Sequence, residues 1–94
     1  MSVYVCTPRV RMGRLVVTPG AISALTTDDL LQGLARHLSG DWGNLEEYDW
    51  KMNDDGVEFG GRLLSEYFAQ DGTKFWIVTE CDRSVTTVLL PQEY

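Results

Sequence analysis

The stretch RLLSEYFAQDGTKFWIVTECDRSVTTVLL, residues 62–90, decides the fold. It contains three runs rich in β-branched and aromatic residues, separated by turn-forming segments at residues 70–73 and 81–84. Asp71-Gly72 is the favoured centre of a two-residue type I′ hairpin turn, and Pro91 closes the last run. These features predict a three-stranded antiparallel meander at the C-terminus.

Two-residue loops at both turns would set the strand registers, and cross-strand partners then share a face of the sheet. One face is expected to carry Leu64, Phe68, Phe75, Ile77, Val88 and Leu90, with Glu66 as the polar exception. The opposite face is expected to carry Leu63, Tyr67, Trp76, Val78, Val85 and Leu89, with Ser65 and Thr87. Helices can cover one apolar face, so the second face must meet the N-terminal segment, a second copy of the chain or another protein.

The first half of the chain predicts an N-terminal strand followed by helices. Residues 2–6 and 13–18 have the alternating, β-branched character of strands. Thr18 is expected to cap a short helix that begins at Pro19 and contributes Ile22 and Leu25. In TTDDLLQGLARHLSG, residues 26–40, Thr26 or Thr27 caps a longer helix that ends at Gly40. Its buried stripe is expected to consist of Leu30, Leu34 and Leu38, widened by Leu31.

A third helix is predicted from Asn44, which with Glu47 resembles a capping box, to about Phe59 before Gly60-Gly61. Its apolar side is expected to comprise Leu45, Tyr48, Met52 and Phe59, with Trp50 off that side. The expected class is therefore α+β: an N-terminal strand, two to three helices, then a C-terminal three-stranded antiparallel meander packed on the helices. The 94 residues make one domain, in which residues 1–12 are expected to form a flexible arm.

Composition and charge exclude several classes of protein. With 44% hydrophobic and 23% charged residues, the chain has the composition of a soluble globular domain. No run of about 18 apolar residues is present and the N-terminus lacks a signal-peptide core, so a cytoplasmic protein without a membrane span is expected. The net charge is −6, and all 14 acidic residues lie from residue 28 onward. Such a body repels phosphate backbones, which disfavours direct nucleic-acid binding.

Metal and cofactor chemistry is not expected. Cys6 and Cys81 are too few and too far apart for a disulfide framework or a zinc site. Gly60-Gly61-Arg62 lacks the strand, glycine and helix order of a phosphate-binding loop. His37 is the only histidine, and its place in the last turn of a helix predicts an interaction with the helix C-terminus.

The densest charge feature is the segment from Asp41 to Glu58, which holds seven carboxylates and one lysine. Most of these groups must project into water, either as an ordinary solvated helix face or as an acidic surface that docks on a basic partner. In the second reading, the chain could inhibit an enzyme by imitating the charge of DNA. The residues expected to bind a partner are Asp41, Glu46, Glu47, Asp49, Asp54, Asp55 and Glu58 on this segment, and Tyr67, Trp76 and Leu89 on the sheet.

The segment TECDRSVTT, residues 79–87, gathers a second set of polar groups around a hairpin end. A carboxylate, a guanidinium and hydroxyls placed there could act as general base, phosphate clamp and positioning groups in phosphodiester cleavage. The same residues also form an ordinary polar turn. Both interpretations stay open.

The pattern GRLVVTPGA, HLSGDWGNL and GGRLLSEYFAQDGTKFWIVTECDRSVTTVLLPQEY resembles a family of small bacterial proteins carried on plasmids and integrated elements, the plasmid-related proteins. The resemblance covers residues 13–94 and implies an accessory protein of a mobile element, without an implied activity. A weaker similarity, in architecture alone, is to small ribonucleases of the barnase-like and toxin types. That similarity implies five candidate catalytic residues, Arg62, Lys74, Glu80, Arg83 and Thr86.

The expected function is therefore protein binding without catalysis, with a protein partner or self-association as a dimer. A small toxin-type ribonuclease is the alternative. No metal or cofactor is expected in either case.

Overall fold

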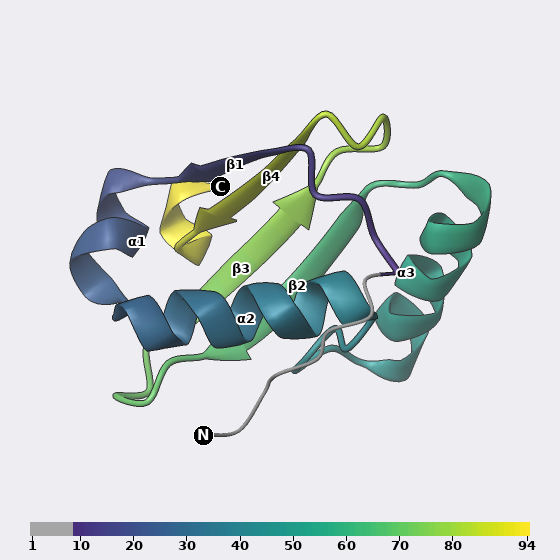
Figure 1. Ribbon diagram of the computed structural model, residues 1–94. Helices are drawn as coiled ribbons and strands as arrows, with labels where there is room; N and C mark the ends of the chain where they lie inside the picture. Colours follow the sequence, from purple (N-terminus) through teal and green to yellow (C-terminus); the bar gives the residue numbers. More distant parts are fainter. Residues whose placement is uncertain (1–8) are drawn as a thin grey trace, which may run out of the picture.

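The computed structural model describes residues 9–94, as three α-helices, a four-stranded sheet and a short C-terminal 3-10 helix (Figure 1). The expected α+β class is confirmed. The elements are β1 (Arg14–Val17), α1 (Pro19–Ala24), α2 (Thr27–Ser39), α3 (Glu47–Phe59), β2 (Leu63–Phe68), β3 (Lys74–Thr79), β4 (Val85–Leu89) and η1 (Pro91–Glu93). The strand predicted over residues 2–6 lies outside the described residues.

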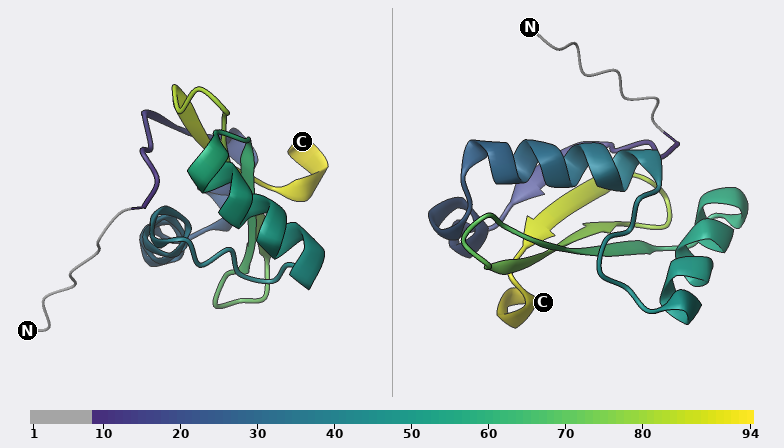
Figure 2. Two further views of the ribbon diagram at one scale, coloured as in Figure 1. Left: turned by 90° about the vertical axis from the view of Figure 1, so that its right-hand side faces the viewer. Right: turned by 90° about the horizontal axis from the view of Figure 1, so that it is seen from below.

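The sheet has the strand order β1-β4-β3-β2, so the N-terminal strand lies beside the last one. β1 runs parallel to β4, and β2, β3 and β4 form the predicted antiparallel meander. α1 and α2 lie on one face of this sheet, here called the helix face, and η1 lies on the opposite face (Figures 1 and 2). α3 lies at the β2 end of the sheet, where it contacts β2 (Figure 2).

The first hairpin differs from the prediction by one residue. Ala69 and Thr73 close a three-residue loop in which Gly72 has a φ of 92°, instead of a two-residue turn centred on Asp71-Gly72. Tyr67 therefore pairs with Phe75, and all of β2 turns over relative to β3. Leu63, Ser65 and Tyr67 lie on the helix face, and Leu64, Glu66 and Phe68 lie on the opposite face, the reverse of their expected grouping relative to β3.

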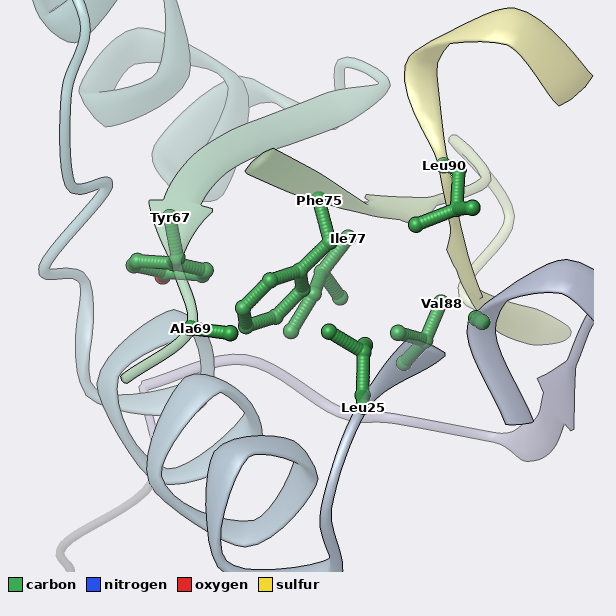
Figure 3. Packing of buried hydrophobic residues seen from close by; sticks show 8 residues of the cluster. Leu25, Tyr67, Ala69, Phe75, Ile77, Val88 and Leu90 are labelled. Atoms are coloured by element: carbon green, nitrogen blue, oxygen red, sulfur yellow. The ribbon is translucent and has the colours of Figure 1, made fainter. Parts of the chain in front are cut away.

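The second hairpin has the predicted register, in which Trp76 pairs with Leu89 and Ile77 with Val88. Phe75, Ile77, Val88 and Leu90 accordingly share the helix face, as expected. Their side chains form the main core with Ala21, Leu25, Tyr67 and Ala69 (Figure 3).

The caps of α1 and α2 are the predicted threonines. Thr18 accepts a hydrogen bond from the Ala21 amide, and Thr26 and Asp29 form a reciprocal capping box. Leu30 and Leu34 pack on the main core as expected. Two predicted core residues are instead exposed: Ile22 by 63% and Leu31 by 59%.

α3 ends at Gly60 as predicted but does not begin at Asn44. Glu46 is its N-cap, and the Asn44 side chain instead donates to Glu66. The inward side of α3 is also different from the expected one. Tyr48, Met52 and Phe59 face the solvent, and the side toward the protein carries Asn53 and Gly56, which are buried, with Trp50 and Val57.

A second small core lies between the end of α2, α3 and β2. Trp42 is fully buried there and donates its indole N–H to Asp54 at 2.9 Å. Val10 is 5% exposed in the same cluster, and both the Arg9 and Val10 amides donate to the carbonyl of Leu38. Residues 9–12 are thus packed on the domain instead of forming part of a loose arm, and the remainder of the expected arm lies outside the described residues.

The outer edge of β2 is closed by polar contacts. The Asn53 side chain accepts from the Leu64 amide at 3.2 Å and donates to the Leu64 carbonyl at 2.7 Å. Further along the strand, the Glu66 amide donates to Trp42 and the Glu66 carbonyl accepts from Asn44. One carboxamide and one short backbone segment therefore satisfy the outward backbone groups of Leu64 and Glu66, which an edge strand would leave open.

No helix within residues 9–94 has the length and apolar character needed to cross a membrane.

Replacing Asn53 with Ala is expected to lower the free energy of unfolding by about 2 kcal/mol, because both backbone groups of Leu64 lose their partner. Asn44→Ala is the matched control. It removes one exposed hydrogen bond and is expected to cost about 0.5 kcal/mol or less. Urea titration of both variants measures the difference, and equal losses would show that Asn53 does not seal the edge.

Candidate functional site

The largest fully buried polar side chain among the described residues is that of His37. It points from α2 onto the helix face of the sheet, instead of toward the helix C-terminus as predicted. Its Nδ1 lies 2.5 Å from the Ser65 hydroxyl, and its Nε2 lies 2.8 Å from the Thr79 hydroxyl. Thr79 contacts the Thr86 hydroxyl at 2.8 Å, and Thr86 donates to the Met12 carbonyl at 2.7 Å.

The directions of the hydrogen bonds between His37 Nε2 and Met12 follow from the last bond of the series, in which Thr86 donates to Met12. Because Thr86 donates to a carbonyl, its oxygen must accept from Thr79, and the Thr79 oxygen must then accept from Nε2–H of His37. In the neutral imidazole, the other ring nitrogen, Nδ1, accepts from Ser65. The arrangement is therefore satisfied by the neutral imidazole with its proton on Nε2.

The pKa of His37 is lowered to about 4, mainly by burial and in addition by the positive charge of Arg83. The histidine is neutral near pH 7. Because every other member of the chain is a hydroxyl or a carbonyl, no partner carboxylate is present to make it a general acid or base. The geometry indicates a structural role.

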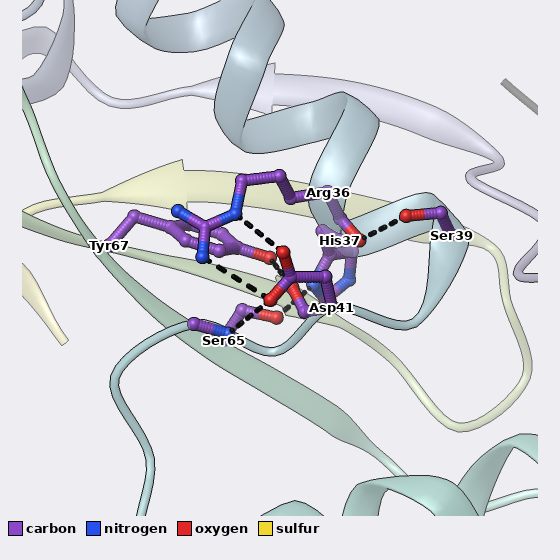
Figure 4. Close-up of polar contacts among 7 residues, drawn as sticks. Arg36, His37, Ser39, Asp41, Ser65 and Tyr67 are labelled. Carbon is purple, nitrogen blue, oxygen red and sulfur yellow. Dashed lines mark hydrogen bonds and ion pairs between the residues drawn. The ribbon is translucent and has the colours of Figure 1, made fainter. Parts of the chain in front are cut away.

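A second polar group lies at the end of α2, where Arg36 makes a two-point ion pair with Asp41 (Figure 4). The hydrogen bond from Arg36 is the main cause that lowers the pKa of Asp41. The Tyr67 hydroxyl donates to the Asp41 carbonyl at 2.6 Å, and the Arg36 guanidinium lies over its ring. Burial raises the pKa of Tyr67. Asp41 and Tyr67, both expected to bind a partner, are thus engaged within the chain.

The other predicted acidic residues stay together on one side of the molecule. α3 itself contains five carboxylates and one lysine, and Glu46 precedes it as the N-cap. None of the ion pairs within residues 9–94 involves a carboxylate of α3. Asp54 is occupied by the Trp42 indole. The exposed members are Glu46, Glu47, Asp49, Asp55 and Glu58.

An apolar stripe runs among these carboxylates on the outer side of α3. Tyr48 is 73% exposed, Met52 53% and Phe59 79%, and their spacings of four and seven residues place them on one side of the helix. Asp55 lies between Met52 and Phe59 on the same side. Tyr48, Met52, Asp55 and Phe59 are called the α3 ridge below. The apolar residues were predicted to form a stripe, but on the buried side.

A groove lies where α3 meets the face of the sheet opposite to α2, and a neighbouring hollow that shares Leu64 and Asp49 with it reaches Met52 of the ridge. The groove has a volume of about 520 Å³. Its lining includes Trp76 and Leu64 from the sheet, Asp49 of α3 and Glu46, the N-cap of α3. The Trp76 indole donates to Glu66 at 2.9 Å, which holds the ring in place. The groove thus combines an aromatic wall with an acidic rim.

The three sheet residues expected to bind a partner have different environments. Tyr67 is 2% exposed on the helix face, because the β2 register differs from the predicted one. Leu89 is 6% exposed on the opposite face, where Tyr94 also lies edge-on against the partly buried Trp76. Of the three, Trp76 alone retains substantial access from the solvent.

The residues of the ribonuclease alternative do not converge on one site. Arg62 pairs with Glu80 at 3.4 Å, but Lys74 begins the same strand that Glu80 follows and lies at its far end. Arg83 donates to the carbonyls of Gly56, Gly61 and Glu80, and so secures the end of α3 to the hairpin. Thr86 is buried in the His37 chain.

Sequence reasoning did not anticipate Asn53, or the polar core formed by Ser65, Thr79 and Thr86. The sequence pattern placed these hydroxyl residues on the strands β2, β3 and β4, but only the observed register brings them together under His37. Cys81 is an exposed free thiol, and Cys6 lies outside the described residues. Within residues 9–94, no group of three or more His, Cys, Asp or Glu side chains is placed to hold a metal ion.

Comparison with known proteins gave no match to a family, a curated protein or a solved structure.

The stability of the protein is expected to fall as the pH drops from 6.5 to 4.5. Unfolded His37 binds a proton near pH 6.5 while folded His37 resists protonation down to about pH 4, so the unfolded state takes up more protons across this interval. The resulting loss is about 2 kcal/mol. Urea titrations at several pH values measure it, and a His37→Gln variant provides the control. An equally steep decline in that variant would assign the pH dependence to other groups.

Proposed function

We propose that this chain is a non-enzymatic binding protein that attaches to a basic surface of a partner protein through the α3 ridge and its surrounding carboxylates. The observation that carries the proposal is the coincidence of three exposed large apolar side chains with exposed carboxylates on one helix side. Protein interfaces combine a central apolar contact with a charged rim in this way.

The charges favour a basic partner. Asp55 is an exposed member of the ridge, Asp49 and Glu58 are exposed beside it, and Lys51 is the only cation of α3. Carboxylates that are not neutralised within their own protein accelerate the encounter with a cationic surface and align the two molecules. The expected attraction weakens as salt is added.

The apolar residues of the ridge are expected to supply binding energy in addition to the attraction between charges. Tyr48, Met52 and Phe59 would each lose exposed surface in a complex, and aromatic side chains commonly dominate the binding energy of interfaces. The groove by Trp76 offers a second contact, in which an arginine or lysine of the partner could lie against the indole and beside Asp49.

A nucleic-acid-binding enzyme fits these requirements, because its substrate groove presents a basic surface that an acidic helix can occupy. This finer version of the proposal makes the chain an acidic inhibitor of such an enzyme. An accessory protein of a mobile element that blocks a host defence enzyme would be one such case. The ribonuclease alternative is not carried forward, because Arg83 and Thr86 serve the interior of the fold and Lys74 lies apart from Glu80.

The double substitution Tyr48→Ser and Phe59→Ser is expected to reduce partner recovery about tenfold or more, since each truncated aromatic anchor typically costs over 1 kcal/mol of binding. The measurement is capture from cells of the native host with the full chain as bait, quantified by mass spectrometry. Ile22→Ser with Leu31→Ser is the matched control, because it removes similarly exposed apolar residues from α1 and α2.

A second pair of baits tests the charge. Asp55→Asn with Glu58→Gln is expected to lose the same partner, whereas Gln32→Lys with Gln92→Lys makes an equal change of net charge away from α3 and is expected to retain it. Recovery of the same proteins by all four variant baits would contradict the proposal. If both charge variants lost the partner to the same extent, the binding would depend on net charge alone and not on the carboxylates of α3.

A further inference from the structure

The two edges of the sheet are not alike. The outer edge of β2 is sealed by Asn53 and by the segment that bonds to Glu66. No described segment lies along the outer edge of β1 (Figure 1). This strand also carries two exposed apolar residues, Leu15 at 40% and Val16 at 37%. An open, apolar edge strand is a template for pairing with another strand.

The backbone N–H and C=O groups of successive β1 residues point alternately toward β4 and away from it. The Arg14 amide donates to Ser84 and the Thr18 amide donates to Val88, so the even-numbered residues turn their backbone groups toward β4. The amides and carbonyls of Leu15 and Val17 therefore point outward, away from the sheet. No hydrogen bond is found for these outward groups within residues 9–94.

We propose that β1 pairs with β1 of a second copy of the chain, in antiparallel orientation about a two-fold axis at Val16. In this register Leu15 of each copy lies opposite Val17 of the other. The two residues exchange both of their outward N–H···O=C bonds, which gives four hydrogen bonds across the axis. Val16 faces its own counterpart, and the two sheets join into one continuous eight-stranded sheet by doubling the four strands of each copy.

Charge complementarity supports this register. Arg14, Val16 and Thr18 share the face on which η1 lies, because Val16 is in register with Thr87 of β4. The Thr18 hydroxyl donates to Glu93 of the same chain at 2.6 Å. Antiparallel pairing about Val16 places Arg14 opposite Thr18 of the other copy, next to that glutamate. Each dimer thus gains two contacts between an arginine and a carboxylate.

Neighbouring registers fit less well. A shift of the axis to Val17 would set Leu15 against Pro19, which has no amide to donate. A shift to Leu15 would require extended pairing by Gly13, whose φ is 64°. The strand is four residues long, so the interface is small and the dimer is expected to dissociate on dilution.

Hydrogen exchange of the full chain over a dilution series provides the first test. The amides of Leu15 and Val17 are expected to exchange more slowly as the protein concentration rises, and those of Arg14 and Val16, already bonded to β4, are expected to change little. The same samples are followed by sedimentation equilibrium. A monomer at all concentrations, or slowing that spares Leu15 and Val17, overturns the proposal.

Charge substitutions provide the second test. Val16→Lys places like charges face to face at the axis and is expected to raise the dissociation constant of the dimer at least about tenfold. Val16→Glu should do the same, and an equimolar mixture of the two variants should associate again. Arg14→Glu is expected to weaken the dimer, whereas Arg11→Glu, the same change outside the paired strand, is not. A dimer that persists unchanged in Val16→Lys and Arg14→Glu overturns the proposal.

This inference is independent of the α3 surface. The Tyr48→Ser with Phe59→Ser variant is expected to dimerise like the wild type. Its loss of partner capture, with dimerisation intact, would support both proposals separately.

Discussion

The buried hydrogen-bonded chain through His37 links β2, β3 and β4 to the segment that leads into β1. Ser65 belongs to β2, Thr79 to β3 and Thr86 to β4, and Met12 stands just before β1. His37 attaches α2 to this series of hydrogen bonds. Buried polar groups are costly unless each finds its partner, so this chain tolerates only the arrangement that satisfies all of its members. A slip of β2 by one residue would turn Ser65 to the other face and leave His37 without a donor.

The exposure of the apolar residues on α3 follows from the packing around His37. With Ser65 fixed beneath His37, Leu64 and Glu66 direct their open backbone groups away from β3, toward the edge where α3 lies. α3 meets that edge with Asn53, a polar residue, and Tyr48 and Phe59 lie on the other side of the helix. The apolar side of the helix is therefore turned to the solvent, where Tyr48, Met52 and Phe59 remain exposed. The same orientation of α3 therefore satisfies the edge of β2 and leaves the apolar residues of the ridge exposed.

Much of the fold could be predicted from the sequence. The meander, the second hairpin register, the threonine caps of α1 and α2 and the end of α3 at Gly60 each depend on local signals. The first hairpin could not be settled locally, because Asp71-Gly72 suits both a two-residue turn and a three-residue loop with glycine in the left-handed region. That single residue of difference moved Tyr67 from the expected surface into the core. His37 was misplaced for a related reason, since its hydroxyl partners come together only through long-range pairing.

The exposure of most carboxylates in the acidic segment could also be predicted. The acidic residues of α3 are exposed as a group, since charged side chains seldom lie buried without a partner. The orientation of α3 was wrong, because the periodicity of apolar residues points inward in most helices, and nothing in the pattern marks Asn53 as a partner for a strand edge. The parallel pairing of β1 with β4 likewise joins the two ends of the chain and has no local signature.

The most direct measurement is the protonation state of His37, the only histidine in the chain, by nitrogen-detected NMR correlation of its ring. The hydrogen-bonded chain predicts a neutral ring with the proton on Nε2 at pH 6 and a titration midpoint near pH 4. A proton on Nδ1, or a midpoint near the ordinary value of 6.5, would contradict the account.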